Sequence, residues 1–300
     1  MAQPTLQQLR YLVAIADHGS FGAAADAEFV SQPALSAQIK ELEKRLGSVL
    51  LERSNKGTVL TASGEEVVRR ARDIVRQVDE LVEAAAHDGE TLRGTVRLGA
   101  IPTVAAYLLP ATVRTVMDLH PDIRLLLHEA KTPDLLEQLR NGEIDLAMMA
   151  RPVDGSDLVA HDLGDDEFLL ALPGSHRLAR RRGGVPLSSL DSERVLLLDE
   201  GHCLRDQTLD VCRMVRNEPD DVQATSLASL VQMVAAGLGV TLLPRCAAPV
   251  EAREGSGVVA KRFTDGSPHR TLVLVWRKSS PNGGIYARLA EAIAAETGLS

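Results

Sequence analysis

The sequence predicts an α/β protein with a small helical N-terminal domain, one long connecting helix and a larger C-terminal region of two lobes. Three patterns support this fold class. Apolar residues recur at helical spacing near the N-terminus, a heptad repeat follows, and strand and helix patterns alternate beyond Gly94. The expected segments are 1–61, 62–93 and 94–300, with lobe I at about 94–165 and 270–300 and lobe II at about 166–269.

The composition is that of a globular protein. Of the 300 residues, 45% are hydrophobic and 25% charged, and no apolar run reaches the roughly 18 residues of a membrane-spanning helix. The N-terminus lacks the apolar stretch of a secretory signal. Three cysteines are too few for a secreted disulfide framework. We therefore expect a cytoplasmic protein with no membrane partner, and we expect no cofactor and no metal.

Charge is unevenly distributed along the chain. The net charge of −8 argues against a protein coated in nucleic acid, yet residues 1–60 are neutral, with six basic and six acidic side chains. Five of those basic residues fall between positions 40 and 56. Such a local cluster can meet phosphates.

Three helices are expected in the first domain. Apolar spacing predicts a helix from Leu6 to Ala16, and Ser20 stands where an N-cap should precede the next helix. Ser31 caps a third helix, with Pro33 in its first turn, where proline is tolerated. A short helix, a tight turn and a second helix indicate a helix-turn-helix, whose second helix enters a DNA major groove.

The start of the third helix carries the residues expected to meet DNA. Gln can bond an adenine edge through two hydrogen bonds, and Ser can bond a base or a phosphate. The polar residues there include Ser31, Gln32 and Ser36. A hairpin pattern follows, and its Arg53 and Lys56 are typical of a basic wing that touches DNA. The same residues also fit a plain helical bundle with solvated polar side chains.

A heptad repeat runs from Ala62 to His87. Its apolar positions alternate in steps of four and three, with charged residues on the other faces. A helix between two compact domains has little of its own chain to pack against, so we expect a dimer seam. A helix packed on its own domain is the alternative. The seam residues are Val67, Ala71, Ile74, Val78, Leu81 and Ala85.

Strands and helices alternate through the C-terminal region. Strands are expected at 96–101, 123–128, 144–149, 168–172, 240–243 and 271–276, and helices at 107–117, 135–140, 226–236 and 285–297. This alternation favours parallel sheets, which bind ligands beyond the carboxyl ends of their strands. Thr103 and Thr132 follow two such ends. Their hydroxyls suit a small polar ligand, or they serve as ordinary helix N-caps.

The stretch from Gly201 to Cys212 holds two of the three cysteines. His202 and Arg205 place positive charge near Cys203, and neighbouring cations lower the pKa of a thiol. Asp206 can orient Arg205. In a helix, Cα atoms nine residues apart are separated by roughly 13 Å, whereas a disulfide needs them within about 7 Å. Either these cysteines never pair, or pairing refolds the segment and acts as a switch.

These motifs resemble those of LysR-type transcriptional regulators, and the resemblance covers essentially the whole chain. The N-terminal signature is Ser31-Gln32-Pro33-Ala34-Leu35-Ser36 followed by Leu50-Leu51-Glu52-Arg53. More narrowly, Ile101-Pro102-Thr103-Val104, His128-Glu129-Ala130 and Gly201-His202-Cys203-Leu204-Arg205-Asp206-Gln207 resemble the hydrogen-peroxide sensors of that family. The resemblance implies a winged helix-turn-helix, a linker helix, and a two-lobed regulatory domain like a periplasmic binding protein.

The resemblance also implies roles for individual residues. Cys203 is the cysteine that peroxide oxidises, and Cys212 is its disulfide partner. The peroxide pocket comprises Thr103, Thr132, His202, Arg205, Asp206 and Arg270, and the DNA contacts are Ser31, Gln32, Pro33, Ser36 and Arg53. Expected partners are promoter DNA, further copies of the chain in dimers and tetramers, and RNA polymerase. Cys246 lies outside the pattern and is expected to be a buried, small apolar residue.

Three other functions fit parts of the sequence. A regulator that responds to a small molecule between the lobes would need the same lobes but no paired cysteines. A hydrolase using Cys203 and His202 would be an enzyme, yet adjacent residues rarely act together as nucleophile and base. A zinc site at these cysteines lacks the usual ligand spacing. We therefore expect a regulator and not an enzyme.

Overall fold

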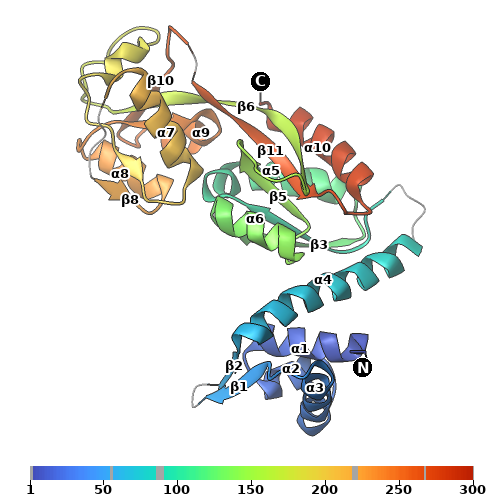
Figure 1. Cartoon of the computed structure of the whole chain (residues 1–300). Coiled ribbons are helices and arrows are strands. Elements are labelled where there is room, and N and C mark those ends of the chain that lie inside the picture. The colour runs from blue at the N-terminus through green and yellow to red at the C-terminus, as the bar shows by residue number, and fades with distance from the viewer. Residues whose placement is uncertain (1–2, 55–56, 86–90, 218–221, 267, 300) are drawn as a thin grey trace. The chain divides into compact units, whose positions relative to one another are not determined.

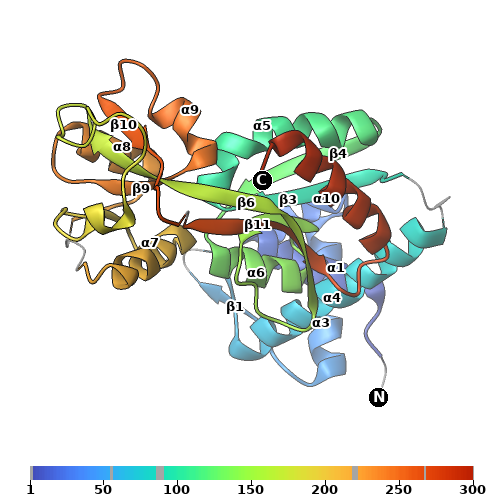
Figure 2. The same ribbon diagram turned by 90° about the horizontal axis from the view of Figure 1, so that it is seen from above.

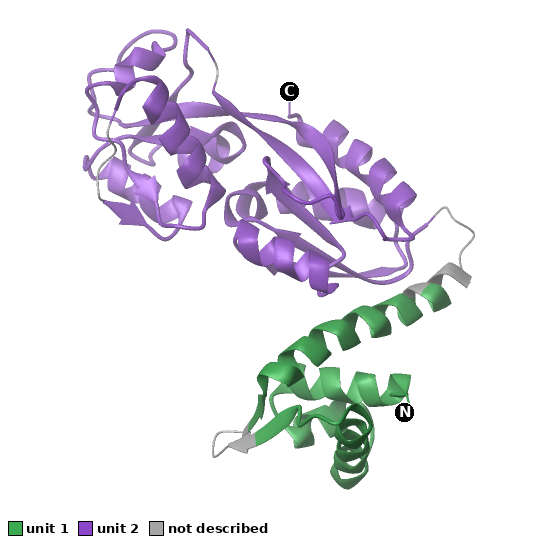
Figure 3. Ribbon diagram, in the orientation of Figure 1, with its two compact units in different colours: residues 1–88 green, residues 89–300 purple. Residues whose placement is uncertain are grey.

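The chain forms two units, Met1–Asp88 and Gly89–Ser300, which Figure 3 colours separately. The computed structural model describes residues 3–54, 57–85, 91–217, 222–266 and 268–299. The first unit contains α1 (Leu6–His18), α2 (Phe21–Ala27), α3 (Gln32–Leu46), β1 (Leu51–Ser54), β2 (Gly57–Leu60) and α4 (Ala62–Ala85), labelled in Figure 1.

The helices of the first unit begin where the sequence provides N-caps. The hydroxyls of Thr5, Ser20 and Ser31 accept hydrogen bonds from the first turns of α1, α2 and α3. Gly19 and Gly47 end α1 and α3 in the left-handed conformation that glycine adopts without strain. The antiparallel pair β1–β2 follows α3. A three-helix arrangement with a hairpin is the predicted winged helix-turn-helix.

The second unit is built on one seven-stranded sheet. Its strands are β3 (Gly94–Ala100), β4 (Ile123–Glu129), β5 (Leu146–Ala150), β6 (Leu158–Pro173), β9 (Thr241–Pro244), β10 (Val258–Lys261) and β11 (His269–Arg277). They lie in the order β10-β6-β11-β5-β3-β4, with β9 also paired to β6. A separate parallel pair joins β7 (Leu197–Leu198) and β8 (Gln223–Ala224).

Helices surround this sheet. They are α5 (Pro102–Leu119), α6 (Thr132–Asn141), α7 (Cys203–Met214), α8 (Leu227–Ala235), α9 (Ala248–Glu251) and α10 (Gly283–Thr297), with short 3₁₀ turns η1 (Leu187–Leu190) and η2 (Arg245–Ala247). Figure 2 shows α5 and α10 on one side of the β3–β11 part of the sheet and α6 on the other. The α/β fold class expected from the sequence is confirmed.

Two long strands connect the two lobes of this unit. The first half of β6 pairs with β11, and its second half pairs with β9 and β10. Both β6 and β11 run antiparallel to their neighbours, whereas β3, β4 and β5 are parallel. Within this sheet, the parallel pairing expected from the sequence is therefore confined to β3, β4 and β5. Each lobe has its own core: Val273 and Leu274 lie in the core of lobe I, and Phe168 and Leu242 in that of lobe II.

Candidate functional site

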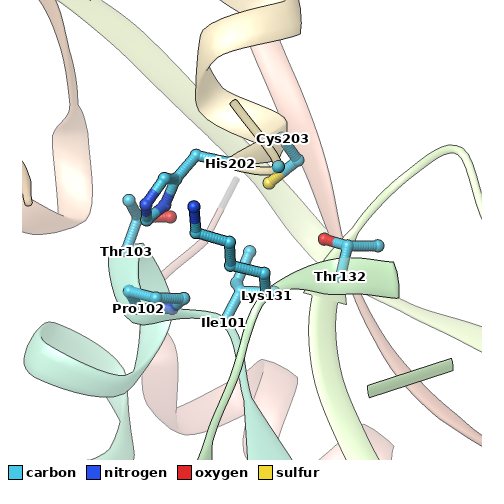
Figure 4. Close-up of a pocket in the computed structure, with 8 residues that line it drawn as sticks. Ile101, Pro102, Thr103, Lys131, Thr132, His202 and Cys203 are labelled. Atoms are coloured by element: carbon cyan, nitrogen blue, oxygen red, sulfur yellow. The ribbon is translucent and has the colours of Figure 1, made fainter. Parts of the chain in front are cut away.

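A small pocket lies between the lobes, where three helices of the second unit begin. Its walls come from the first turns of α5, α6 and α7 and from the residues just before them (Figure 4). The lining residues are Ile101, Pro102, Thr103, Lys131, Thr132, Gly201, His202 and Cys203. Helix N-termini present unpaired N–H groups and partial positive charge. The pocket therefore suits a small polar or anionic group.

Cys203 is the first residue of α7, and its side chain is half-buried. The hydroxyl of Thr132 faces its sulfur (Figure 4). Burial raises the pKa of the Cys203 thiol above its ordinary value, and this effect exceeds the opposing ones. The charge of Arg270, the neighbouring Thr132 hydroxyl and the Leu204 N–H each lower the pKa. One cation, one hydroxyl and one backbone amide are thus in place to stabilise a thiolate.

Arg270 is held in a fixed orientation behind the pocket. It stands opposite Asp166 in the β6–β11 ladder, and both side chains are fully buried. Its Nε and Nη2 donate to Asp166 Oδ2 at 3.1 and 3.0 Å. Its Nη1 donates to Thr103 Oγ1 at 2.7 Å. Because the Thr103 oxygen accepts this bond, its hydroxyl hydrogen is available to donate elsewhere.

The two basic residues near Cys203 in the sequence, His202 and Arg205, have other partners in the structure. Arg205 Nη1 donates to Leu198 O at 2.8 Å. Burial, and then Lys131, lower the pKa of His202, which is therefore neutral at pH 7. Asp206 raises the pKa of Cys203. The charge that lowers this pKa most is that of Arg270, which the fold brings in from a distant strand.

Cys212 lies in a different environment from Cys203. It is 1% exposed and belongs to the core of lobe II, whereas Cys203 packs against the core of lobe I. Burial raises the pKa of Cys212 to about 11. Both cysteines belong to the continuous helix α7, so their Cα atoms are roughly 13 Å apart. All three cysteines of the chain are free thiols here.

Cys246 packs against the core of lobe I, as a small apolar residue would, but it also contacts two buried charged side chains. Its backbone N–H donates to Asp166 Oδ1 at 3.0 Å, and its Sγ lies 3.1 Å from Asp166 Oδ2. Its Sγ is also 3.7 Å from Arg270 Nη2. Burial raises the pKa of the Cys246 thiol to about 12. The residue is therefore a protonated thiol that donates to the same carboxylate as Arg270.

The predicted DNA contacts lie at the start of α3. Ser31, Gln32 and Pro33 are exposed, and Ser36 is half-buried. Ser31 Oγ accepts from Ala34 N at 3.4 Å, so this hydroxyl caps the helix. The backbone of Arg53 lies in β1, but its side chain falls outside the described parts of the chain, as does Lys56.

The predicted seam residues lie along α4 and fall into two groups, one packed against the first unit and one facing outward. Ala71 is 1% exposed and Val67 packs against the same core of the first unit, so these residues pack on their own domain. The expectation that Ala71 forms a dimer seam is therefore wrong. Ile74 and Leu81 are exposed and Val78 is half-buried, while the side chain of Ala85 falls outside the described residues. The second half of α4 still presents apolar residues.

Sequence reasoning missed two residues of the site. Asp166 lies within the acidic run Asp165–Glu167, which shows no sign of burial in the sequence. Lys131 comes just before Thr132, at a strand end already considered as a ligand site, but no role followed from it. Its Nζ reaches lobe II, donating to Glu200 O at 2.6 Å.

Comparison with known proteins identifies the family. Residues 6–65 match the family described as bacterial regulatory helix-turn-helix protein, lysR family, and residues 89–298 match the LysR substrate binding domain. The chain belongs to the LysR family. This membership confirms the family inferred from the sequence motifs.

The relatives include proteins named as activators of hydrogen-peroxide-inducible genes. The chain is 42% identical to a "Probable hydrogen peroxide-inducible genes activator" of Streptomyces viridosporus, over 97% of this chain and 94% of that protein. It is 42% identical to the "DNA-binding transcriptional dual regulator OxyR" of Escherichia coli K12, over 97% and 95%.

Solved structures of OxyR proteins have a similar fold. Full-length OxyR of Pseudomonas aeruginosa, a cysteine-to-aspartate variant, has a TM-score of 0.82 at 32% identity, covering 98% of this chain and 95% of that one. An H₂O₂-bound cysteine-to-serine mutant of Corynebacterium glutamicum OxyR has a TM-score of 0.65 at 36% identity, covering 100% and 97%.

Two further features bear on this LysR-family chain. Within the described ranges, no helix is long and apolar enough to cross a membrane. Among the same residues, no group of three or more His, Cys, Asp or Glu side chains could hold a metal ion.

Proposed function

We propose that this protein is a DNA-binding transcriptional regulator that senses hydrogen peroxide through Cys203 and Cys212. One observation carries the proposal: the Cys203 thiol is in a small pocket with Thr103 and Thr132, next to the fixed charge of Arg270. The relatives named as activators of hydrogen-peroxide-inducible genes support hydrogen peroxide as the compound to which this chain responds.

The first chemical step is oxidation of Cys203. Its thiolate attacks one peroxide oxygen, so that an S–O bond forms, the O–O bond breaks and hydroxide leaves with the electron pair. The sulfur loses two electrons and becomes a sulfenic acid. The hydroxyls of Thr103 and Thr132 are placed to donate to the peroxide oxygens, and hydroxide takes a proton to become water. Arg270 stabilises the negative charge of the attacking thiolate.

The second step joins Cys203 to Cys212. The Cys212 sulfur attacks the sulfenic sulfur, an S–S bond forms, the S–O bond breaks and water leaves. Because the two residues are at opposite ends of an intact helix and in different cores, α7 must partly unwind first. Oxidation thus exchanges one conformation of lobe II for another, which is how a redox signal can reach a bound promoter.

The proposed DNA contacts, the pairing of chains and the partner proteins are based on the first unit and on membership of the LysR family. Ser31, Gln32, Pro33 and Ser36 contact DNA from α3, and Arg53 contacts it from the wing. The exposed apolar face of α4, with Ile74, Val78 and Leu81, pairs two chains, and pairs assemble into tetramers. The regulator acts in the cytoplasm with RNA polymerase.

Peptide mapping of the full-length protein tests this function. After a brief, stoichiometric dose of peroxide, we expect a Cys203–Cys212 linked peptide in the wild type. Cys212→Ser should accumulate a sulfenic acid at Cys203 that dimedone traps, and Cys203→Ser should give neither product. Cys246→Ser is the matched control and should still form the Cys203–Cys212 linkage. If Cys203 stays reduced, or links only to Cys246, the proposal is wrong.

A further inference from the structure

Lys131 connects the two lobes at the edge of the pocket. It lies between β4 and α6 of lobe I, and its amine reaches the segment of lobe II between β7 and α7. The Lys131 Nζ donates to Glu200 O at 2.6 Å and lies 3.3 Å from both carboxylate oxygens of Asp199. Figure 4 shows its side chain extended across the pocket toward His202.

The segment that Lys131 contacts leads directly into α7. Residues 199–202 precede Cys203, the first residue of that helix. The backbone at Gly201 has φ of +87°, and an added Cβ there would lie 2.9 Å from the Lys131 side chain, so the two segments fit closely. His202 Nε2 lies 3.0 Å from Asp199 Oδ1, which links the carboxylate held by Lys131 to the residue before Cys203.

We propose that Lys131 is a positioning residue that clamps residues 199–201 to lobe I and thereby stabilises the reduced conformation. This inference rests on the proposed function, because the clamp matters only if Cys203 must leave its pocket to reach Cys212. The start of α7 cannot move freely while its preceding segment is bonded to lobe I. The clamp therefore sets how readily the disulfide forms.

The sign of the effect on the redox equilibrium follows from this role. Reduction adds two electrons and two protons to the disulfide and restores two thiols. A bond made only in the reduced protein favours reduction, which raises the midpoint potential. Removing the bond should shift the equilibrium toward the disulfide by about tenfold, corresponding to a midpoint potential about 30 mV more negative.

The experiment is a redox titration of the full-length protein in dithiothreitol buffers, followed by thiol alkylation and mass spectrometry. Lys131→Met keeps the apolar stem and removes the amine, and it should show the tenfold shift. Lys131→Arg restores a charged donor and should return most of the wild-type equilibrium. Lys261→Met is the matched control: Lys261 Nζ also donates to a carbonyl, that of Arg181 at 2.8 Å, but within lobe II. It should titrate like the wild type.

The outcomes separate the clamp from the function on which it rests. A wild type without any Cys203–Cys212 disulfide would refute the proposed function itself. A wild-type disulfide with an unchanged midpoint potential in Lys131→Met would refute only the clamp. An unchanged potential with slower oxidation of Cys203 would assign Lys131 to the peroxide step and also overturn the clamp.

Discussion

Asp166 and Arg270 face each other across the β6–β11 ladder and form an ion pair at 3.0 Å with both side chains fully buried. The pair lies where these strands pass from one lobe to the other, so it belongs to neither lobe alone. Asp166 fixes the guanidinium, and the guanidinium in turn orients Thr103 and lowers the pKa of Cys203. Mutations can separate the effect of this ion pair on the reactivity of Cys203 from its effect on folding stability.

Arg270→Met should slow peroxide oxidation of Cys203, because the thiolate loses the buried cation that lowers its pKa. The variant also leaves the Asp166 carboxylate buried without its cationic partner, which typically costs about 3–5 kcal/mol. The double variant Arg270→Met/Asp166→Asn removes that carboxylate charge, so it should recover stability without recovering rate. Stopped-flow oxidation and urea unfolding measure the two effects. Wild-type rates in both variants would remove Arg270 from the mechanism.

Folding stability should decline in mild acid because of His202. Burial, and then Lys131, lower its folded pKa below the 6.5 of the unfolded chain, while Asp199 opposes them. Below pH 6.5 the unfolded chain therefore binds a proton that the folded protein does not yet bind, so stability falls until the pH reaches the folded pKa. His202→Gln should reduce the loss of stability between pH 7 and pH 5, measured by urea unfolding with Trp276 fluorescence.

Two comparisons check that assignment. His18→Gln changes an exposed histidine of the first unit and should leave the pH dependence of Trp276 unfolding unchanged. Burial also lowers the pKa of His120 in the second unit, so part of the acid sensitivity should remain in His202→Gln. An identical pH dependence in wild type and His202→Gln would contradict the argument.

Much of the fold could be predicted because local signals agree with it. Ser20, Ser31 and Gly47 mark helix ends in the sequence, and the structure uses them as such. The 16-residue strand β6 could not be predicted at full length, because the acidic run Asp165–Glu167 separates its mostly half-exposed first part from the apolar, buried stretch Phe168–Pro173. Antiparallel pairing between β5 and β11 is a long-range contact that no local pattern specifies.

The candidate site was only partly predictable for the same reason. Thr103 and Thr132 follow strand ends in the sequence, whereas only the family resemblance grouped them with Cys203, and all three line the pocket. Its position two residues after Cys203 suggested that Arg205 stabilises the thiolate. In the structure the Arg205 side chain instead donates to a backbone carbonyl of β7, a contact that the sequence does not reveal. Arg270 was expected only from the family resemblance, and its partner Asp166 looks like any exposed acid until the ladder register is known.

The recognition helix and the wing should affect DNA binding in different ways. Gln32 is exposed at the start of α3, so Gln32→Ala should change base preference at one or two positions of the operator, at a cost of about 1–3 kcal/mol. Arg53→Ala should weaken binding to all sequences and lower the salt slope by about one unit. Fluorescence anisotropy across a salt series measures both. Arg114→Ala, in the second unit, is the control and should match the wild type.

The exposed apolar face of α4 should hold two chains together through its second half. Ile74 is 45% exposed and Leu81 is 66% exposed, although both are large apolar side chains on one helix face. Ile74→Asp or Leu81→Asp would place a charge in an apolar seam and should dissociate the dimer in analytical ultracentrifugation. Ala62→Asp, at the first residue of α4 where an acidic side chain is favourable, is the matched control. An unchanged sedimentation coefficient in both seam variants would mean that the chains associate through another surface.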